Sequence, residues 1–298
     1  MNDLVPAGSF SLCLANMPFG AARRRFNPAA LRVRSEHLCA ALRRFTSRDR
    51  LRSGLPRGTP AMPGYQIKLE DVAIGGVADV HIRCLLDRQQ YADPLGAAAA
   101  LGISSAAWPL FGMVWPSGLQ LAAAVAQRPV RADERILEIG CGLALASLIC
   151  HRRGSQVTAS DCHPLAGEFL RQNLLLNHLP PLPYRHGDWG APQEADLAPT
   201  CAQGPRLQGR YELIIGSDVL YERDDAGVLP QFIARHAAAV GEVLIVDPNR
   251  GNRSPFHRRM QAMGYTLQET RLLAPADAAG AIYRGRLLHY RRGLIAAH

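Results

Sequence analysis

The chain has 298 residues, of which 48% are hydrophobic and 20% are charged, and this composition excludes a wholly disordered protein. Its formal net charge of +9 is concentrated before residue 60, where eleven arginines stand against three acidic residues, while 23 basic and 22 acidic residues follow. The nearly neutral remainder argues against a large nucleic-acid-binding face, because affinity for duplexes comes from clustered basic side chains.

Residues 1–60 are rich in arginine and poor in acidic residues, and their apolar residues follow no sustained period. We predict an extension that is either disordered or wrongly assigned. Its composition resembles a transit peptide, and would equally arise from translation begun upstream of a native start at Met62. The seven cysteines are scattered without a C-x-x-C pair, which predicts reduced thiols, no metal site and a cytoplasmic protein.

Residues 61–107 contain a predicted β-hairpin and a connecting segment. Apolar and polar side chains alternate from Tyr65 to Val72 and again from Ala78 to Leu85. Two adjacent glycines between these runs supply the turn.

An uncharged stretch from Pro94 to Gln127 is long enough to cross a membrane. Prolines and glycines interrupt it, and its alanine-rich parts have weak hydropathy. These features favour a buried loop followed by a helix near residues 117–127, so we predict no membrane partner.

Strands and helices alternate regularly over the main domain, residues 108–298, as is typical of a parallel sheet with helices on both faces. The last two strands have no helix between them, so we expect one of them to run antiparallel at an edge. The predicted fold is therefore α/β and Rossmann-like, with a seven-stranded, mostly parallel sheet and the N-terminal hairpin. The predicted strands cover 135–139, 156–160, 184–186, 211–217, 242–246, 265–273 and 282–290, and the helices 143–152, 165–177, 225–239 and 253–262.

A turn with two glycines connects the first strand of this domain to its helix, which lets a ligand approach the backbone closely. A dinucleotide fingerprint needs glycine or alanine where Leu145 stands, and leucine would obstruct a pyrophosphate. The alternative is a tight turn that binds no ligand. The cofactor-binding candidates in this segment are Glu138, Gly140, Cys141 and Gly142.

The next two strands end in residues suited to a nucleoside. Asp161 follows Gly140 by 21 residues, where an open parallel sheet places an acid that accepts both ribose hydroxyls. Asp188 and Trp189 close the third strand, and offer a carboxylate for an adenine amino group and an aromatic face for its ring. A tryptophan alone is more typical of a core, but the position after a third strand favours cofactor contact.

The fourth strand ends at Ser217, and Asp218 and Tyr221 follow it. Because the carboxyl ends of central strands line the crevice where ligands react, we take Ser217 as cofactor-binding and the other two as catalytic. The alternative role for Asp218 is to cap a helix that begins near Asp224, but a gap of six residues disfavours it.

Together these motifs resemble those of the class I, seven-β-strand protein lysine methyltransferases. The glycine turn is similar to the E-x-G-x-G-x-G motif, with Ala144 in place of the third glycine. The Asp218-x-x-Tyr221 segment resembles the D-x-x-Y element that this family places at the substrate lysine.

Two further segments carry the resemblance, which covers roughly residues 100–298. Trp115 begins a run similar to the family's W-P-x-G segment, whose tryptophan contacts the cofactor. Asp247-Pro-Asn249-Arg250 is similar to the D-P-G-R of the branch that modifies the β subunit of electron transfer flavoprotein, with Asn249 in place of glycine.

The resemblance implies S-adenosylmethionine as cofactor and a protein lysine as substrate, with no stable nucleic-acid partner. Asp218 would orient the amine and Tyr221 would pack along its stem. Because Asp218 would also favour the charged amine, deprotonation is expected before final docking. The alternatives are a methyltransferase for a small molecule or RNA, a cofactor-binding regulatory protein without activity, and an NAD-dependent oxidoreductase. The residues leave the substrate and the oligomeric state open.

Overall fold

The computed structural model describes residues 64–192, 200–221, 223–275 and 282–293. The predicted N-terminal extension lies outside the described residues. No helix in the described part of the chain is long and apolar enough to cross a membrane.

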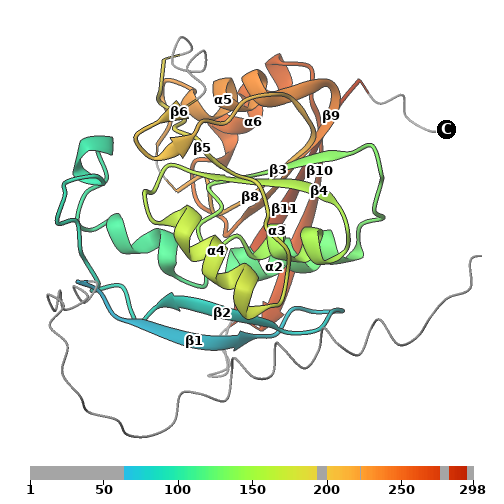
Figure 1. Ribbon diagram of the computed structural model, residues 1–298. Coiled ribbons are helices and arrows are strands. Elements are labelled where there is room, and N and C mark those ends of the chain that lie inside the picture. Colours follow the sequence, from blue (N-terminus) through green and yellow to red (C-terminus); the bar gives the residue numbers. More distant parts are fainter. Residues whose placement is uncertain (1–63, 193–199, 222, 276–281, 294–298) are drawn as a thin grey trace, which may run out of the picture. The chain divides into compact units, whose positions relative to one another are not determined.

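A seven-stranded sheet forms the centre of the described part (Figure 1). Its order is β10-β11-β9-β8-β3-β4-β5; neighbours from β9 to β5 are parallel, and β11 runs antiparallel to both of its neighbours. The antiparallel strand lies second from the edge rather than at it, because β10 takes the outer position and the chain then turns back beside β9. The strands are β3 (Arg135–Ile139), β4 (Gln156–Asp161), β5 (Tyr184–His186), β8 (Tyr211–Ser217), β9 (Ala237–Asp247), β10 (Thr266–Pro275) and β11 (Ile282–Arg292).

Helices cover both faces of this sheet, as the alternating pattern predicts (Figure 1). Successive residues of a strand point to opposite faces, so Leu213 packs in the core beneath α2, α3 and α4, whereas Ile214 packs beneath α5 and α6. The central strands are apolar on both sides because both sides are covered. The helices are α2 (Pro116–Gln127), α3 (Leu145–Arg152), α4 (Ala166–Leu176), α5 (Val228–His236) and α6 (Arg253–Ala262).

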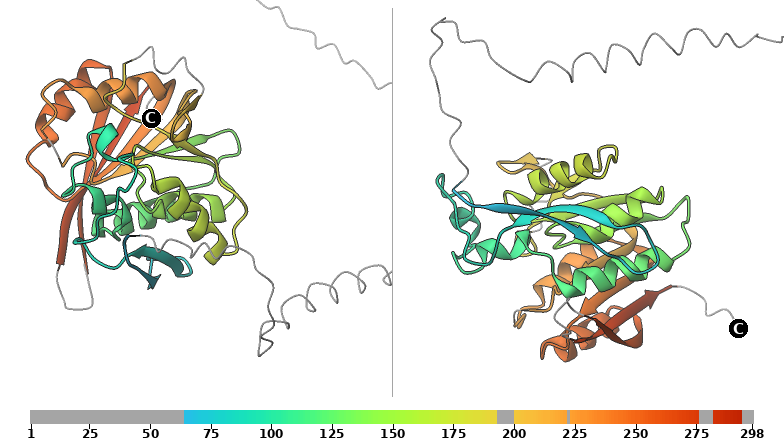
Figure 2. Two further views of the ribbon diagram at one scale, coloured as in Figure 1. Left: turned by 60° about the vertical axis from the view of Figure 1, so that its left-hand side comes forward. Right: turned by 90° about the horizontal axis from the view of Figure 1, so that it is seen from below.

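The predicted N-terminal hairpin, β1 (Ile67–Val72) and β2 (Val80–Leu85), packs against α4 (Figure 2). Two asparagines hold it there: Asn173 and Asn177 each accept a backbone N–H of β2 and donate to a carbonyl of the same strand. Side-chain amides thus satisfy the backbone edge that β2 would otherwise expose. The hairpin also shares its core with the main sheet.

The uncharged stretch before β3 forms two short 3₁₀ helices, η2 (Ala99–Leu101) and η3 (Trp108–Gly112), and then α2. Trp108 is fully buried and contacts the rings of Phe111 and His163, so the stretch packs as core. A second short hairpin, β6 (Thr200–Cys201) and β7 (Gly204–Pro205), lies in the loop before β8.

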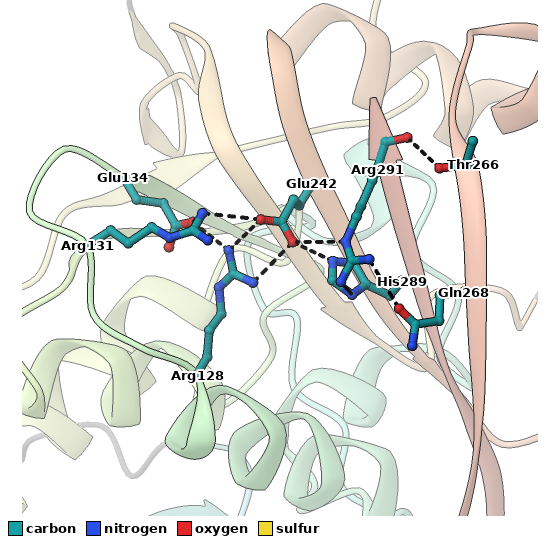
Figure 3. Close-up of polar contacts among 8 residues, drawn as sticks. All are labelled: Arg128, Arg131, Glu134, Glu242, Thr266, Gln268, His289 and Arg291. Carbon is teal, nitrogen blue, oxygen red and sulfur yellow. Dashed lines mark hydrogen bonds and ion pairs between the residues drawn. The ribbon is translucent and has the colours of Figure 1, made fainter. Parts of the chain in front are cut away.

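A buried polar cluster joins α2 to the amino-terminal part of the sheet (Figure 3). Its centre is Glu242 on β9, which accepts hydrogen bonds from Arg128, Arg131 and His289. Arg128 also donates to Glu134, at 2.6 Å. The hydrogen bond from His289 and the two bonds from Arg128 hold the pKa of Glu242 well below its usual range. We call this group the Glu242 cluster.

Candidate active site

A cavity of about 640 Å³ opens outside the carboxyl ends of β3, β4 and β8. The order of the sheet reverses here, because β4 pairs with one side of β3 and β8 with the other, and ligands of open parallel sheets bind at such a point. All the residues predicted to bind cofactor or to act in catalysis line this cavity. They are Trp115, Glu138, Gly140, Cys141, Gly142, Asp161, Asp188, Trp189, Ser217, Asp218 and Tyr221.

Conformation and space both require glycine in the turn between β3 and α3. Gly140 and Gly142 have φ angles of 55° and 51°, in the left-handed region that side chains rarely allow. A Cβ at Gly142 would lie 2.8 Å from the carbonyl oxygen of Phe111, and one at Gly140 would lie 3.2 Å from the ring of Trp189. The turn therefore presents bare backbone to the cavity.

Glu138 lies behind the turn and ties it to the following helix. Its side chain is buried, and its Oε2 accepts a hydrogen bond of 2.7 Å from the N–H of Ser147 in the first turn of α3. Burial raises the pKa of Glu138 to about 7. The structure thus gives Glu138 a supporting contact within the turn, in addition to its place on the cavity wall.

Asp161 connects the end of β4 to the same turn. One carboxylate oxygen accepts the N–H of Gly142 and the other accepts the N–H of His163, both at 2.8 Å. Burial raises the pKa of Asp161. A carboxylate has about four lone-pair sites, so these two contacts leave capacity for ligand hydroxyls.

Cys141 and Ser217 complete the floor of the cavity. The N–H of Cys141 donates to the carbonyl of Ser160, and burial raises the pKa of the Cys141 thiol well above its usual range, so the thiol stays neutral. Ser217 is the last residue of β8 and pairs in register with Val246.

Sequence reasoning missed His163, which lies two residues after Asp161 and is 3% exposed. Its ring stacks on Phe111 with centroids 3.7 Å apart, and its Nδ1 accepts the N–H of Leu165. Nε2 therefore carries the ring proton, and among the described residues it has no hydrogen-bond partner. Burial lowers the pKa of His163 to about 3, so this wall of the cavity holds a neutral donor without a protein acceptor.

Asp188 and Trp189 form the wall beyond β5. The Oδ1 of Asp188 accepts the N–H of Gly190 at 2.9 Å, which fixes the bend of the loop. The half-buried ring of Trp189 lies across Gly140 and packs toward Phe232.

Trp115 stands at the start of α2 and is held from both sides. Its indole Nε1 donates to the carbonyl of Leu110 at 2.8 Å, and the guanidinium of Arg88 lies 4.7 Å from the ring centroid. Arg88 also lines the cavity, and it comes from the segment after the hairpin, in which sequence reasoning predicted no site residue.

Asp218 turns into the cavity through an uncommon backbone conformation, with φ at 53°. Its carboxylate pairs with Arg250, whose Nε lies 2.7 Å from Oδ1 and whose Nη2 lies 2.9 Å from Oδ2. The alternative capping role belongs instead to Asp224, which accepts the N–H groups of Val228 and Leu229 at the start of α5. Asp218 is thus available to the cavity, but in contact with a cation.

Tyr221 lines the same part of the cavity and is 48% exposed. The Asp218-x-x-Tyr221 segment therefore sets a carboxylate against a guanidinium and contributes an aromatic ring to the same cavity.

Comparison of the sequence with known proteins shows the family of this chain. A family model described as lysine methyltransferase matches residues 109–262, just over half of the chain. The chain belongs to this lysine methyltransferase family. Electron transfer flavoprotein beta subunit lysine methyltransferase from Xenopus laevis is 30% identical over 168 residues, which cover 54% of this chain and 63% of that protein. Histone-arginine methyltransferase METTL23 from Xenopus laevis is 32% identical over 121 residues, 39% of this chain and 47% of that protein.

The chain thus spans about three fifths of the length of the electron transfer flavoprotein relatives that it matches. A solved structure of a methyltransferase from Pyrococcus furiosus matches with a TM-score of 0.44 and 17% identity over 57% of this chain and 81% of that chain.

Two residues depart from the family motifs, and both have a positive φ angle that glycine would adopt without strain. Ala144 has φ of 59° and Asn249 has φ of 65°. Asparagine adopts this conformation more readily than most residues, and Asn249 gains a hydrogen bond of 2.8 Å from the Nε of Arg286. Ala144 has no such compensation in its side chain, so the left-handed conformation costs about 1–2 kcal/mol there.

Proposed function

We propose that this member of the lysine methyltransferase family uses S-adenosylmethionine to methylate a lysine side chain of a protein. The observation that carries the proposal is the single cavity that joins the glycine turn and Asp161 to Asp218 and Tyr221. It brings a nucleoside-binding half and an amine-binding half within reach of one ligand. The β subunit of electron transfer flavoprotein is the first substrate to test, because relatives that modify it match the chain.

The cavity fits the cofactor in size and in polar groups. Its volume of about 640 Å³ lies within the usual range for a site that encloses a small molecule. Asp161 keeps acceptor capacity for ribose hydroxyls, and the Nε2–H of His163, which has no hydrogen-bond partner among the described residues, offers a donor in the same wall. Bare backbone at Gly142 allows close approach.

In this reaction the main task of the protein is to align the amine nitrogen with the methyl group. S-adenosylmethionine supplies a methyl group on a positively charged sulfur. The amine nitrogen forms the new bond with its lone pair while the carbon–sulfur bond breaks and sulfur keeps the electron pair, so the nitrogen must be neutral and in line. With a lysine pKa of about 10.4, a neutral amine at pH 7 costs about 4–5 kcal/mol.

Asp218 and Tyr221 provide the alignment in this proposal. A carboxylate oxygen of Asp218 accepts one N–H of the amine, because its contacts with Arg250 leave lone pairs open. The ring of Tyr221 packs along the methylene stem and tolerates the positive charge that develops on nitrogen.

A lysine target also agrees better with this geometry than an arginine target. Asp218 already engages a guanidinium with both oxygens, so a substrate guanidinium would need to displace Arg250 to form the same fork. A single N–H of an amine needs no displacement.

The proposal extends to a reducing, cytoplasmic setting, which the five free cysteines of the described residues support.

The activity can be tested by incubating the protein with tritiated S-adenosylmethionine and a cognate cell extract. Mass spectrometry then identifies the labelled species. Label in a protein lysine is expected, whereas label confined to metabolites or RNA would reject the lysine assignment.

The matched variants are Asp218→Ala and Asp224→Ala, which remove carboxylates six residues apart. Asp218→Ala should abolish methyl transfer and leave the affinity for S-adenosylmethionine, measured by calorimetry, nearly unchanged. Asp224→Ala removes the cap of α5 and should lower thermal stability without stopping transfer. Preserved turnover in Asp218→Ala would refute the assigned role.

A further inference from the structure

Arg250 occupies both oxygens of Asp218, the carboxylate that is proposed to receive the amine. The two contacts, at 2.7 and 2.9 Å, form the side-on fork that is typical of strong arginine–carboxylate pairs. The backbone N–H of Arg250 donates to Asp247, a fully buried residue at the end of β9, so the arginine is anchored to the sheet. Asp218 itself is anchored by its N–H, which donates to the carbonyl of Val246.

The Asp218–Arg250 pair matters because a carboxylate beside the target lysine affects whether that lysine is charged. An unpaired carboxylate beside the target lysine would favour the ammonium form, and an opposite charge at 4–6 Å raises an amine pKa by about 1–3 units. The ammonium form has no lone pair and cannot attack a methyl group. A carboxylate that orients the amine therefore also inhibits it, unless another charge balances it.

We propose that Arg250 is a positioning residue that balances the charge of Asp218, so that the target lysine docks and reacts as the neutral amine. The inference rests on the proposed lysine methyltransferase activity. Arg250 never touches the reacting atoms; it acts through Asp218. The lysine proton leaves to bulk solvent before the nitrogen attacks, and Asp218 keeps one lone pair directed to the amine N–H.

The remaining charged groups around the pair do not provide this balance. Asp247 lies behind Arg250 and is acidic, and Tyr283, whose pKa burial raises, is neutral and hydrogen-bonded to Ser117. Tyr221 is the other ionisable group at this side of the cavity. The rest of the wall contributes Arg88, Glu138, Asp161, His163 and Asp188. Among these described groups, Arg250 is the cation in contact with Asp218.

Three variants of the full chain test the inference: Arg250→Gln removes the charge, Arg250→Lys keeps it without the fork, and Arg253→Gln removes a charge three residues away. Arg253 pairs with Glu269 and lies outside the cavity wall, so it is the matched control. The measurement is the single-turnover rate at saturating electron transfer flavoprotein β subunit and S-adenosylmethionine, from pH 6 to 10. Under these conditions the acid limb reports the amine in the bound complex.

We expect the midpoint of the acid limb to move to higher pH by about one unit or more in Arg250→Gln, which lowers the rate at neutral pH about tenfold. At high pH the rate should return to within a few-fold of the unmodified protein. Arg250→Lys and Arg253→Gln should keep the original midpoint. Glu138, whose pKa of about 7 falls in this range, is the same in all four proteins and cancels in the comparison.

An Arg250→Gln protein that is slower at every pH with an unshifted midpoint would overturn the inference, because a purely structural arginine gives that result. Thermal melting and calorimetry with S-adenosylmethionine establish that each variant is folded, and Arg250→Met, which also removes the charge, provides the test if Arg250→Gln is not folded. Failure of the unmodified protein to label any protein lysine would reject the proposed function itself, and the inference with it.

Discussion

The two ends of the sheet each hold a carboxylate beside arginine, but they use it differently. Glu242, in the amino-terminal part, is 5% exposed and accepts from Arg128, Arg131 and His289. Asp218, beyond the carboxyl end of β8, is 14% exposed and pairs with Arg250, which is itself 43% exposed. The buried carboxylate is saturated with donors, whereas the one at the cavity keeps lone pairs and a path to solvent.

Backbone strain also differs between the two ends of the sheet. Of the four non-glycine residues with positive φ in the described part of the chain, Ala144, Asp218 and Asn249 lie in the cavity-forming loops, and the other is His178. Strained residues persist where the surrounding structure holds them, and they gather at functional sites. The Glu242 end thus stabilises the fold, whereas backbone strain at the Asp218 end lowers the free energy of unfolding and holds the cavity loops in shape.

The largest expected effect comes from Glu242→Ala. This change leaves the Arg128 guanidinium, 15% exposed, with Glu134 as its remaining carboxylate partner, so the loss of unfolding free energy should be about 3 kcal/mol, the lower end of the range for a broken buried pair. Urea denaturation measures it. Glu168→Ala, which breaks the exposed pair with Arg171, is the control and should cost less than about 1 kcal/mol. Similar losses in both variants would remove the contrast drawn between buried and exposed pairs.

A second prediction concerns how the stability contributed by Glu242 depends on pH. The pKa of Glu242 is lowered in the folded protein, chiefly by the hydrogen bond from His289, so its stabilisation is present above about pH 4.5 and is lost as pH falls toward the folded pKa. Glu242→Gln cannot titrate. The difference in unfolding free energy between the two proteins should therefore shrink between pH 5 and pH 3, as measured by urea midpoints. A constant difference over that interval would contradict the assignment, since other carboxylates titrate equally in both.

Local patterns in the sequence predicted most of the fold. The strand predicted for 135–139 became β3 with the same bounds, and the helix predicted for 253–262 became α6. The insertion of β11 between β9 and β10 was not predictable in this way, because partner choice among strands depends on packing across the sheet. The edge contacts of Asn173 and Asn177 with β2 join residues 90 and 96 positions apart.

The candidate site shows the same limit. Residues that follow strand ends, such as Asp161 and Asp218, were predicted because parallel strands bring their carboxyl ends together. Arg250 was noticed as part of a motif but not as a partner of Asp218, because 32 residues separate them and only the fold joins them. His163 gave no signal, since a lone histidine is more often part of a core and its orphaned Nε2 appears only in three dimensions.

The smallest expected effect concerns the backbone strain at the cavity. Here two alanine-to-glycine substitutions should change the free energy of unfolding in opposite directions. Ala144→Gly should stabilise the protein by about 0.5–1 kcal/mol, because glycine adopts the φ of 59° without the Cβ clash of alanine. Ala146→Gly, two residues along in the first turn of α3, should instead destabilise by about 0.5–1 kcal/mol, because glycine in a helix loses more conformational freedom on folding than alanine.

Both alanines are fully buried, so the loss of a buried methyl group is common to the two variants and the difference between them isolates the backbone. Urea denaturation of both proteins measures that difference. If both substitutions destabilised equally, Ala144 would carry no strain, and the cavity end of the sheet would be as relaxed as the Glu242 end. The opposite signs would instead show that the third position of the glycine turn still favours glycine, and that this chain keeps alanine there against its backbone.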